Sequence, residues 1–199
     1  MAPYDQNPRG HAESISAIVE KTPYIFFDRD GTIIVEKHYL HEPSEVEFCP
    51  GAVEGMLMLK EMGFHFAVVT NQSGIGRGYY QARDMQATHD HIEEELKIHD
   101  VMIDGWYHCP HAPDENCMCR KPNPGMFEQA SEHLRIDVGQ SYVIGDKACD
   151  IDFGIKCGMA TVLVMTGHGE CYDFNESSKP DVCVRNILEF ANTLCHEKL

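Results

Sequence analysis

The stretch Tyr24-Ile25-Phe26-Phe27-Asp28-Arg29-Asp30-Gly31-Thr32 decides the fold of this chain. Its first four residues are all apolar, which predicts a short strand buried on both faces, as in a parallel sheet. The strand would deliver two carboxylates, those of Asp28 and Asp30, at its C-terminal end. Gly31 then lets the chain turn sharply. An isolated Asp-x-Asp pair is more often a polar turn than a reactive site, so the rest of the chain must distinguish the two.

The 199 residues suffice for one domain, and strand-like and helix-like segments alternate through it. This alternation predicts a doubly wound, Rossmann-like α/β fold with a parallel sheet. Residues 1–22 form a weakly patterned N-terminal extension, helical in pattern at 13–20, and residues 23–199 form the domain. His89, in a helix expected at 81–99, should lie at the surface or half-buried. We expect strands at 24–27, 64–69, 106–107, 142–144, 160–165 and 182–184, and helices at 50–62, 81–99, 125–134, 148–157 and 186–197.

Composition excludes several kinds of partner. Hydrophobic residues make up 43% of the chain and charged residues 24%, so a normal core can form. The formal net charge of -16 argues against general affinity for nucleic acid or for an anionic membrane. No apolar run approaches the roughly 18 residues of a membrane helix, and the polar N-terminus lacks the apolar core of a secretory signal. These features favour a cytoplasmic protein.

Polar residues gather at the ends of the expected strands. Asp28 and Asp30 follow the first strand, Thr70 ends the second, and Asp146 follows the strand at 142–144. Ligands of open parallel sheets bind beyond the carboxyl ends of the strands, so these side chains mark a candidate site. Because the chain is acidic overall, cations concentrated there would suit a phosphorylated substrate. Six of the sixteen basic residues lie in or beside these motifs, namely Arg29, Lys37, Arg77, Arg120, Lys121 and Lys147.

The order of these motifs resembles that of the haloacid dehalogenase superfamily, whose phosphatases form an aspartyl-phosphate. The string Asp28-Arg29-Asp30-Gly31-Thr32 is similar to the nucleophile motif of that superfamily. The resemblance implies that Asp28 is the nucleophile and Asp30 the acid/base, and that Thr70 and Lys121 stabilise the phosphoryl group. The later motifs follow in the same order, with Thr70 in the second, Lys121 in the third, and Gly145-Asp146-Lys147 with Asp150 in the acidic fourth.

Elementary chemistry is consistent with that assignment. A carboxylate that attacks a phosphate dianion meets like-charge repulsion, which a hard cation such as Mg²⁺ would relieve. The expected Mg²⁺ ligands are Asp28, Asp146 and the backbone carbonyl of Asp30. The hydroxyl of Thr70 and the ammonium of Lys121 would hold the equatorial phosphoryl oxygens and balance their charge.

A second cluster, Cys109-x-His111-x5-Cys117-x-Cys119, has the composition of a zinc site. Three thiolates and one imidazole would complete a tetrahedral shell, which predicts structural rather than catalytic Zn²⁺. The loop leads toward Lys121, so zinc would fix the position of the phosphate-binding lysine. The alternative is a loop of free thiols. The chain has nine cysteines, an odd number, and without an export signal we expect no disulfide framework.

The intervals between the motifs are short. The interval from Asp30 to Thr70 has room for a flap, one helix and one strand, and that from Thr70 to Lys121 for a helix, a strand and the cysteine loop. Neither interval would hold the cap domain that many members of the superfamily have. We therefore expect no cap, and an open site whose walls are the flap at 33–47 and the cysteine loop.

Two branches of capless, zinc-bearing members resemble the chain. One contains phosphatases of D-glycero-D-manno-heptose 1,7-bisphosphate, and the other contains phosphatases of histidinol phosphate. The string from Thr70 to Gly78 is closer to the first branch. The second branch usually has an acid in place of Ser73 and an arginine in place of Lys147. Resemblance to the heptose branch implies removal of the C7 phosphate, in the biosynthesis of nucleotide-activated heptose.

The same resemblance implies a set of substrate contacts. Ile34 and His38 depart from the Asn and Gly that the heptose branch often has. The alternatives to a heptose phosphatase are a histidinol-phosphate phosphatase and, more remotely, a catalytically dead, zinc-stabilised binding module. We expect a monomer that acts on a small sugar phosphate, because no extra apolar stripe is evident. The implied substrate contacts are Glu36, Lys37, His38 and Tyr39 in the flap, Asn71, Gln72 and Ser73 after the second strand, and Arg120 and Lys147.

Overall fold

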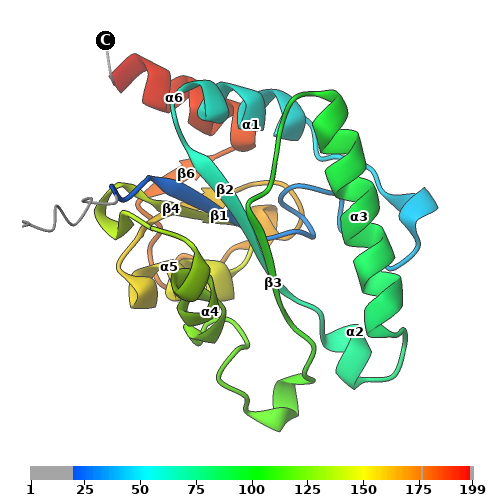
Figure 1. Ribbon diagram of the computed structural model, residues 1–199. Coiled ribbons are helices and arrows are strands. Elements are labelled where there is room, and N and C mark those ends of the chain that lie inside the picture. Colours follow the sequence, from blue (N-terminus) through cyan, green and yellow to red (C-terminus); the bar gives the residue numbers. More distant parts are fainter. Residues whose placement is uncertain (1–19, 176, 198–199) are drawn as a thin grey trace, which may run out of the picture.

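The computed structural model describes residues 20–175 and 177–197, and within them a six-stranded sheet (Figure 1). All neighbouring strands are parallel, in the order β3-β2-β1-β4-β5-β6. This is a doubly wound order, and it confirms the predicted α/β fold. The strands are β1 (Tyr24–Phe27), β2 (His65–Asn71), β3 (Gly105–Cys109), β4 (Tyr142–Gly145), β5 (Ala160–Val164) and β6 (Val182–Val184).

The apolar run of β1 lies at the centre of the molecule. All four of its residues are buried, because helices cover both faces of the sheet. Since side chains alternate along a strand, Ile25 and Phe27 enter the core cluster on one face, and Tyr24 and Phe26 enter the cluster on the other. An uninterrupted apolar run is therefore what this central position requires.

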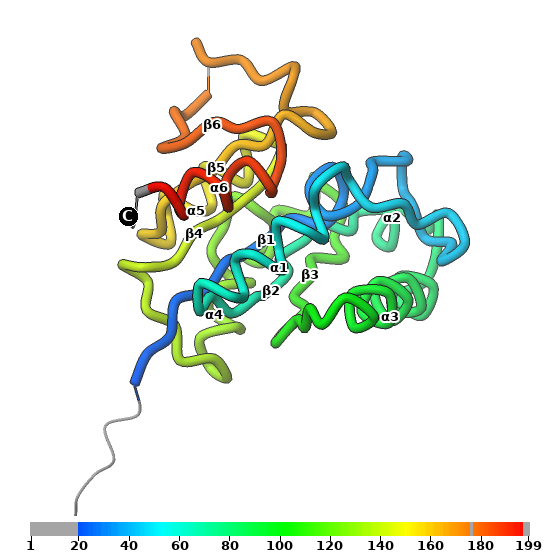
Figure 2. The backbone as a smooth tube through the Cα atoms, turned by 90° about the horizontal axis from the view of Figure 1, so that it is seen from above, coloured from blue at the N-terminus to red at the C-terminus, as the bar shows by residue number. Residues whose placement is uncertain are grey.

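The helices form two layers around the sheet. Helices α1 (Ala52–Glu61), α3 (Ala82–Ile98) and α6 (Ile187–Glu197) pack on the face of Ile25 and Phe27. Figure 2 shows α1 and α6 side by side above the sheet, where they contact each other. Helices α4 (Gly125–His133) and α5 (Ala148–Cys157) cover the opposite face. The remaining helical elements are α2 (Ser73–Gly76) and short 3-10 turns at 43–45, 113–115, 138–140 and 169–171.

The sequence did not predict all details of these elements. Strand β2 runs to Asn71 because its end pairs with β3, which is itself longer than expected. Helix α2 had no clear signal in the sequence. His89, expected at the surface or half-buried, is buried, and its ring stacks on that of Trp106 at 4.4 Å. The helical pattern at 13–19 lies outside the described residues.

The intervals between the motifs hold no inserted domain. From Asp30 to Thr70 the chain, which the structure describes throughout this interval, forms a flap, α1 and β2. From Thr70 to Lys121, also described in full, it forms α2, α3, β3 and the cysteine loop. The expected absence of a cap is thus seen directly in these intervals. In the described part of the chain, no helix has the length and apolar character needed to cross a membrane.

Candidate active site

The candidate site lies where the strand order changes direction, between β1 and β4. Asp28 directly follows β1 and Asp146 directly follows β4, so the parallel arrangement brings both carboxylates to the same edge of the sheet. A cavity of about 250 Å³ opens there. It is lined by Asp28, Arg29, Asp30, Glu36, His38, Tyr39, Thr70, Asn71, Gln72, Ser73, Tyr80, Arg120, Lys121, Lys147, Cys149 and His168.

Asp28 is a buried carboxylate with hydrogen-bond donors on one of its oxygens. It is only 5% exposed, and its Oδ1 accepts hydrogen bonds from the backbone N–H of Arg29 at 2.8 Å and from Lys121 Nζ at 3.0 Å. Burial acts to raise the pKa of Asp28, but the charges of Lys121 and Lys147 outweigh it and lower the pKa below its usual range. Asp28 is therefore an ionised carboxylate at neutral pH.

Lys121 is held rigidly beside Asp28. Its ammonium group donates to the carbonyl of Val69 at 2.7 Å and lies 2.6 Å from Asp150 Oδ1 and 3.0 Å from Asp28 Oδ1. These three contacts account for the three hydrogens of an ammonium group. Burial lowers the pKa of Lys121, but the two carboxylates raise it above its usual value, so the group stays charged.

The side chain of Asp146 occupies a space that exists only because two neighbouring residues are glycines. A Cβ atom at Gly31 or at Gly167 would lie 2.3 Å from Asp146 Oδ2, and both glycines have positive φ, 87° and 57°. The same Oδ2 accepts the backbone N–H of His168 at 2.8 Å. One carboxylate oxygen is thus anchored by the fold, and the other, Oδ1, faces Lys147.

The oxygen donors at this edge of the sheet suit a hard cation. Lys147 Nζ lies 3.1 Å from Asp146 Oδ1, 3.2 Å from the carbonyl oxygen of Asp30 and 3.7 Å from Asp28 Oδ2. A positive charge therefore already stands among the three expected Mg²⁺ ligands. Burial and, second, the charge of Asp28 raise the pKa of Asp146 to about 7. The residues fit a magnesium ion, a cation that prefers carboxylate and carbonyl oxygens.

Asp30 is held by two buried side chains. Arg29, only 1% exposed, donates from Nη2 to Asp30 Oδ1 at 2.9 Å and from Nε to Oδ2 at 3.0 Å. Gln72 donates to the same Oδ2 at 2.9 Å. The carboxylate of Asp30 is therefore fixed in one orientation by three hydrogen bonds.

The flap at 33–47 forms one wall of the cavity through ring contacts. The ring of Tyr39 lies edge-on to that of Tyr79, with centroids 4.8 Å apart, and His41 stacks on Tyr80 at the same distance. Lys37, although described, is not among the lining residues. Its ammonium donates to the carbonyl of Glu45 at 2.8 Å, so the structure does not bring this expected substrate contact into the cavity.

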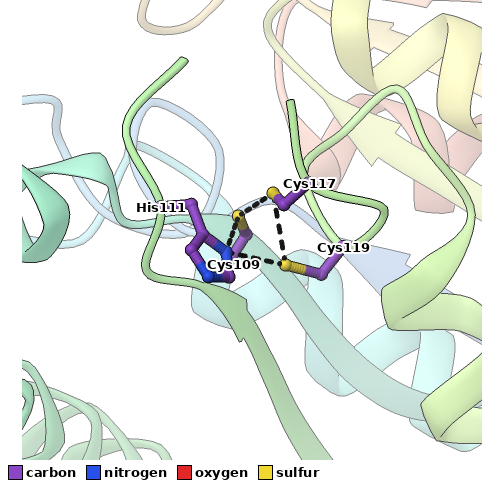
Figure 3. A group of neighbouring side chains, drawn as sticks. All are labelled: Cys109, His111, Cys117 and Cys119. Atoms are coloured by element: carbon purple, nitrogen blue, oxygen red, sulfur yellow. Dashed lines mark hydrogen bonds between the residues drawn. The ribbon is translucent and has the colours of Figure 1, made fainter. Parts of the chain in front are cut away.

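The four expected zinc ligands converge on one point (Figure 3). Cys109 Sγ lies 3.4 Å from Cys117 Sγ and 3.6 Å from His111 Nδ1. Cys119 Sγ lies 3.2 Å from that nitrogen and 3.5 Å from Cys117 Sγ. A tetrahedral ion with bonds of about 2.3 Å to sulfur places its ligand atoms roughly 3.8 Å apart. The cluster is therefore close to the size that Zn²⁺ requires.

The side chains of two asparagines bond to the backbone of the cysteine loop and of Lys121. Asn71 accepts the backbone N–H of Lys121 at 3.0 Å and donates to the carbonyl of Lys121 at 3.2 Å. Asn123 donates to the carbonyl of Cys117 at 3.0 Å. Asn71, expected to contact substrate, thus also holds the backbone of Lys121 in place.

Most of the expected site residues come together in this one cavity. Tyr80, Cys149 and His168 also line it and were not among the expected residues. Tyr80 and His168 reach the site from loops distant in the chain, and neither has a local motif that would have revealed it. Arg29 was noted as a nearby cation, but its bonds to Asp30 could not be anticipated from its position in the motif.

A HAD-hydrolase-like family model matches residues 118–190. The D-glycero-beta-D-manno-heptose-1,7-bisphosphate 7-phosphatase of Escherichia coli (strain K12) is 42% identical over 158 residues, which are 75% of this chain and 83% of that protein. The D-glycero-alpha-D-manno-heptose-1,7-bisphosphate 7-phosphatase of Photorhabdus laumondii is 39% identical over 156 residues, covering 74% and 85%.

A solved structure agrees with these relatives. The crystal structure of D,D-heptose 1,7-bisphosphate phosphatase from B. bronchiseptica, complexed with magnesium and phosphate, superposes with a TM-score of 0.80 and 29% identity. The match covers 88% of this chain and 99% of that one.

The fold, the carboxylates at its switch point and these matches agree on the class, a phosphoric monoester hydrolase of the haloacid dehalogenase type. Within that class, the chain belongs to the family of the D-glycero-D-manno-heptose-1,7-bisphosphate 7-phosphatases. This membership confirms the predicted superfamily and favours the heptose branch over the histidinol phosphate branch.

Proposed function

We propose that the chain hydrolyses the C7 phosphate of a D-glycero-D-manno-heptose 1,7-bisphosphate through a phosphoryl-enzyme. The observation that carries this proposal is the ionised, nearly buried carboxylate of Asp28 beside the fixed cation Lys121, in a cavity of a size for a small ligand. The names of the relatives support the choice of substrate.

The reaction follows from the positions of two carboxylates. An oxygen of Asp28 attacks phosphorus, and the bond from phosphorus to the C7 oxygen breaks. Protonated Asp30 gives its proton to that oxygen, which leaves the sugar alcohol and an aspartyl-phosphate. Ionised Asp30 then takes a proton from a water molecule that attacks phosphorus. Inorganic phosphate leaves, and the carboxylate of Asp28 is restored.

The neighbouring cations reduce the repulsion between Asp28 and the phosphate. Lys121 Nζ lies 3.0 Å from the carboxylate and stays charged, so a positive charge is present before substrate arrives. Thr70 would donate its hydroxyl hydrogen to a phosphoryl oxygen. Asp28, Asp146 and the carbonyl of Asp30 would hold Mg²⁺, which when bound neutralises charge on the phosphoryl oxygens.

The remaining cations of the cavity suit the second phosphate of a bisphosphate. Arg120 and Lys147 line the cavity together with the flap residues Glu36, His38 and Tyr39. Ser73, which lines it as well, has a neutral side chain that offers no charge partner to an ammonium group. These features support a sugar bisphosphate over the amine-bearing histidinol phosphate.

We also propose that Zn²⁺ occupies the cluster of Cys109, His111, Cys117 and Cys119 as a structural ion. Four protein ligands close its coordination shell, so it would order the loop rather than take part in the reaction. Clusters of metal-binding rather than disulfide-bonded cysteines are typical of a reducing compartment, which supports a cytoplasmic location. The proposed working form is a monomer.

Parallel assays of phosphate release test the substrate. With Mg²⁺, kcat/KM for the heptose 1,7-bisphosphate, in both anomers, should exceed that for histidinol phosphate by about 10²-fold or more, because unmatched charges are poorly tolerated in such a cavity. A preference for histidinol phosphate would contradict the proposed substrate while leaving the reaction type intact. Hydrolysis of neither would favour the binding-module alternative.

A further inference from the structure

Gln72 connects four residues of the site through its side chain. It is 3% exposed, and all of the hydrogen-bonding capacity of its amide is used. Its Nε2 donates to Asp30 Oδ2 at 2.9 Å and to Thr70 Oγ1 at 2.8 Å. Its Oε1 accepts from the Tyr80 hydroxyl at 2.6 Å and from Arg29 Nη2 at 3.2 Å. An amide has two donors and one acceptor oxygen with two lone pairs, so this side chain is saturated.

The partners determine which way the amide points. Arg29 can only donate, so it must face the oxygen of Gln72 rather than its nitrogen. The amide nitrogen then faces the Asp30 carboxylate and the Thr70 hydroxyl oxygen. Tyr80 completes the acceptor side, and its ring fills the space that Gly74 leaves, since a Cβ there would lie 2.1 Å from Tyr80 Cε1.

We propose that Gln72 is a positioning residue for the acid/base and for the phosphate-binding hydroxyl, rather than a substrate ligand. The proposal rests on the function proposed above for Asp30 and Thr70. Thr70 Oγ1 accepts a hydrogen bond from Gln72, so the Thr70 hydroxyl hydrogen points elsewhere and is available to a phosphoryl oxygen. Gln72 and Arg29 also both donate to Asp30 Oδ2. These bonds keep the carboxyl group of Asp30 directed at the leaving-group oxygen and the water with which it exchanges protons.

The same bonds connect the flap to the acid/base. His41 of the flap stacks on the ring of Tyr80 with an interplanar angle of 10°, and the Tyr80 hydroxyl bonds to Gln72. Arg29 also donates to the carbonyl of Leu40 in the flap at 3.0 Å. Two separate connections therefore run from the flap to Asp30, one through Gln72 and one through Arg29.

Two substitutions of Gln72 distinguish a residue that positions Asp30 and Thr70 from one that only supports Tyr80 and Arg29. Gln72→Glu keeps two acceptor lone pairs for Tyr80 and Arg29 but cannot donate to Asp30 or Thr70. Gln72→Met keeps the approximate shape, adds no charge and also lacks the donors. Gln86→Glu, on the exposed face of α3, is the control for an added carboxylate at the surface. A role limited to supporting Tyr80 and Arg29 would be satisfied by Gln72→Glu.

The readout is the dependence of kcat/KM on the leaving group, because kcat/KM reports the steps up to cleavage of the ester bond and not the later hydrolysis of the aspartyl-phosphate, which both esters share. Each protein is assayed with heptose 1,7-bisphosphate, whose alkoxide needs a proton, and with p-nitrophenyl phosphate, whose leaving group does not. Both Gln72 variants should lose about 10²-fold in kcat/KM on the sugar phosphate, the scale of positioned proton transfer. On p-nitrophenyl phosphate they should lose roughly tenfold less than that. Thermal unfolding checks that the variants stay folded.

The possible outcomes distinguish this inference from the proposed function. If Gln72→Glu retains wild-type kcat/KM on both esters, or loses equally in kcat/KM on both, Gln72 does not position the acid/base. If Gln72→Glu lost activity only because its new carboxylate repels that of Asp30, Gln72→Met would stay active. That outcome would also overturn the inference. If the wild-type protein hydrolyses p-nitrophenyl phosphate but not the heptose bisphosphate, the proposed substrate is wrong. The Gln72 comparison then proceeds with an alkyl phosphate that the protein does accept, and wild-type inactivity on every ester would overturn both.

Discussion

Lys121 Nζ lies 3.0 Å from Asp28 Oδ1, and the two residues are 3% and 5% exposed. Each charge therefore stabilises the other at a position that water hardly reaches. The pair keeps Asp28 ionised and places a cation where phosphoryl oxygens would come. Removing one partner leaves the other charge buried and uncompensated, which costs far more than the loss of a surface ion pair.

The first prediction concerns this pair. Lys121→Met should lower the free energy of unfolding by about 3–5 kcal/mol, because it leaves Asp28 and Asp150 without their shared cation. It should also abolish phosphate release. Urea denaturation at pH 7.5 measures the first effect. Lys147→Met is the control, since Lys147 is one-third exposed and should cost less stability. Equal stability of the two variants would contradict the account of Lys121.

The second prediction concerns zinc. Cys117→Ser should reduce the zinc content, lower the unfolding midpoint and weaken phosphate release, because the loop that precedes Lys121 loses its crosslink. Elemental analysis and thermal unfolding provide the measurements. Cys171→Ser, at an exposed cysteine outside the cluster, should change none of these. The absence of stoichiometric zinc in wild-type protein purified without chelator would contradict the proposed zinc site.

The third prediction concerns magnesium binding and pH. Burial and the charge of Asp28 raise the pKa of Asp146 to about 7, so protons compete with the metal for this carboxylate. The Mg²⁺ affinity of the metal-free protein should fall by about tenfold per pH unit below 7. Calorimetric titration at pH 6 and pH 8 tests this. Asp146→Asn should bind Mg²⁺ weakly at both values, and a wild-type affinity that does not change between them would contradict the assignment.

The fourth prediction concerns stability at low pH. Burial lowers the pKa of His89 to about 2, with a smaller contribution from Arg29. The unfolded chain takes up a proton near pH 6.5 while the folded protein does not, so folding stability is lost as the pH falls below that value. Between pH 7.5 and pH 5 this amounts to about 2 kcal/mol. His89→Phe, which keeps a ring on Trp106, should flatten the decline in urea denaturation. An equally steep decline in this variant would rule out His89 as the cause.

The fold could be predicted from the sequence because each central strand has a recognisable pattern of apolar and polar residues. The apolar run at 24–27 predicted a strand buried on both faces, as the structure shows, and parallel strands bring their carboxyl ends to one edge. Asp28, Thr70 and Asp146 could therefore be placed together without coordinates. The cluster expected to bind zinc was equally local, because its four candidate ligands lie within eleven residues.

The remaining features depend on contacts between distant segments. Gln72 looked like a substrate contact, but its amide bonds to three side chains from separate segments, the loop after β1, β2 and the loop after α2. His89 lies in a strongly charged helix, so burial against Trp106 of β3 could not be inferred from its neighbours. Lys37 looked like one more cation for a phosphate, yet Glu45 and Glu47 hold it away from the cavity. Such outcomes depend on tertiary geometry, which local pattern does not contain.

The most direct test of the account is to trap the phosphoryl group on the enzyme. Wild-type protein is mixed with Mg²⁺ and heptose 1,7-bisphosphate labelled at the C7 phosphate, quenched with acid within milliseconds and digested. We expect the label on the peptide that contains Asp28, and we expect Asp28→Asn to show neither label nor turnover while keeping its fold. Turnover without any labelled peptide, or labelling that persists in Asp28→Asn, would contradict the central claim that Asp28 is the nucleophile.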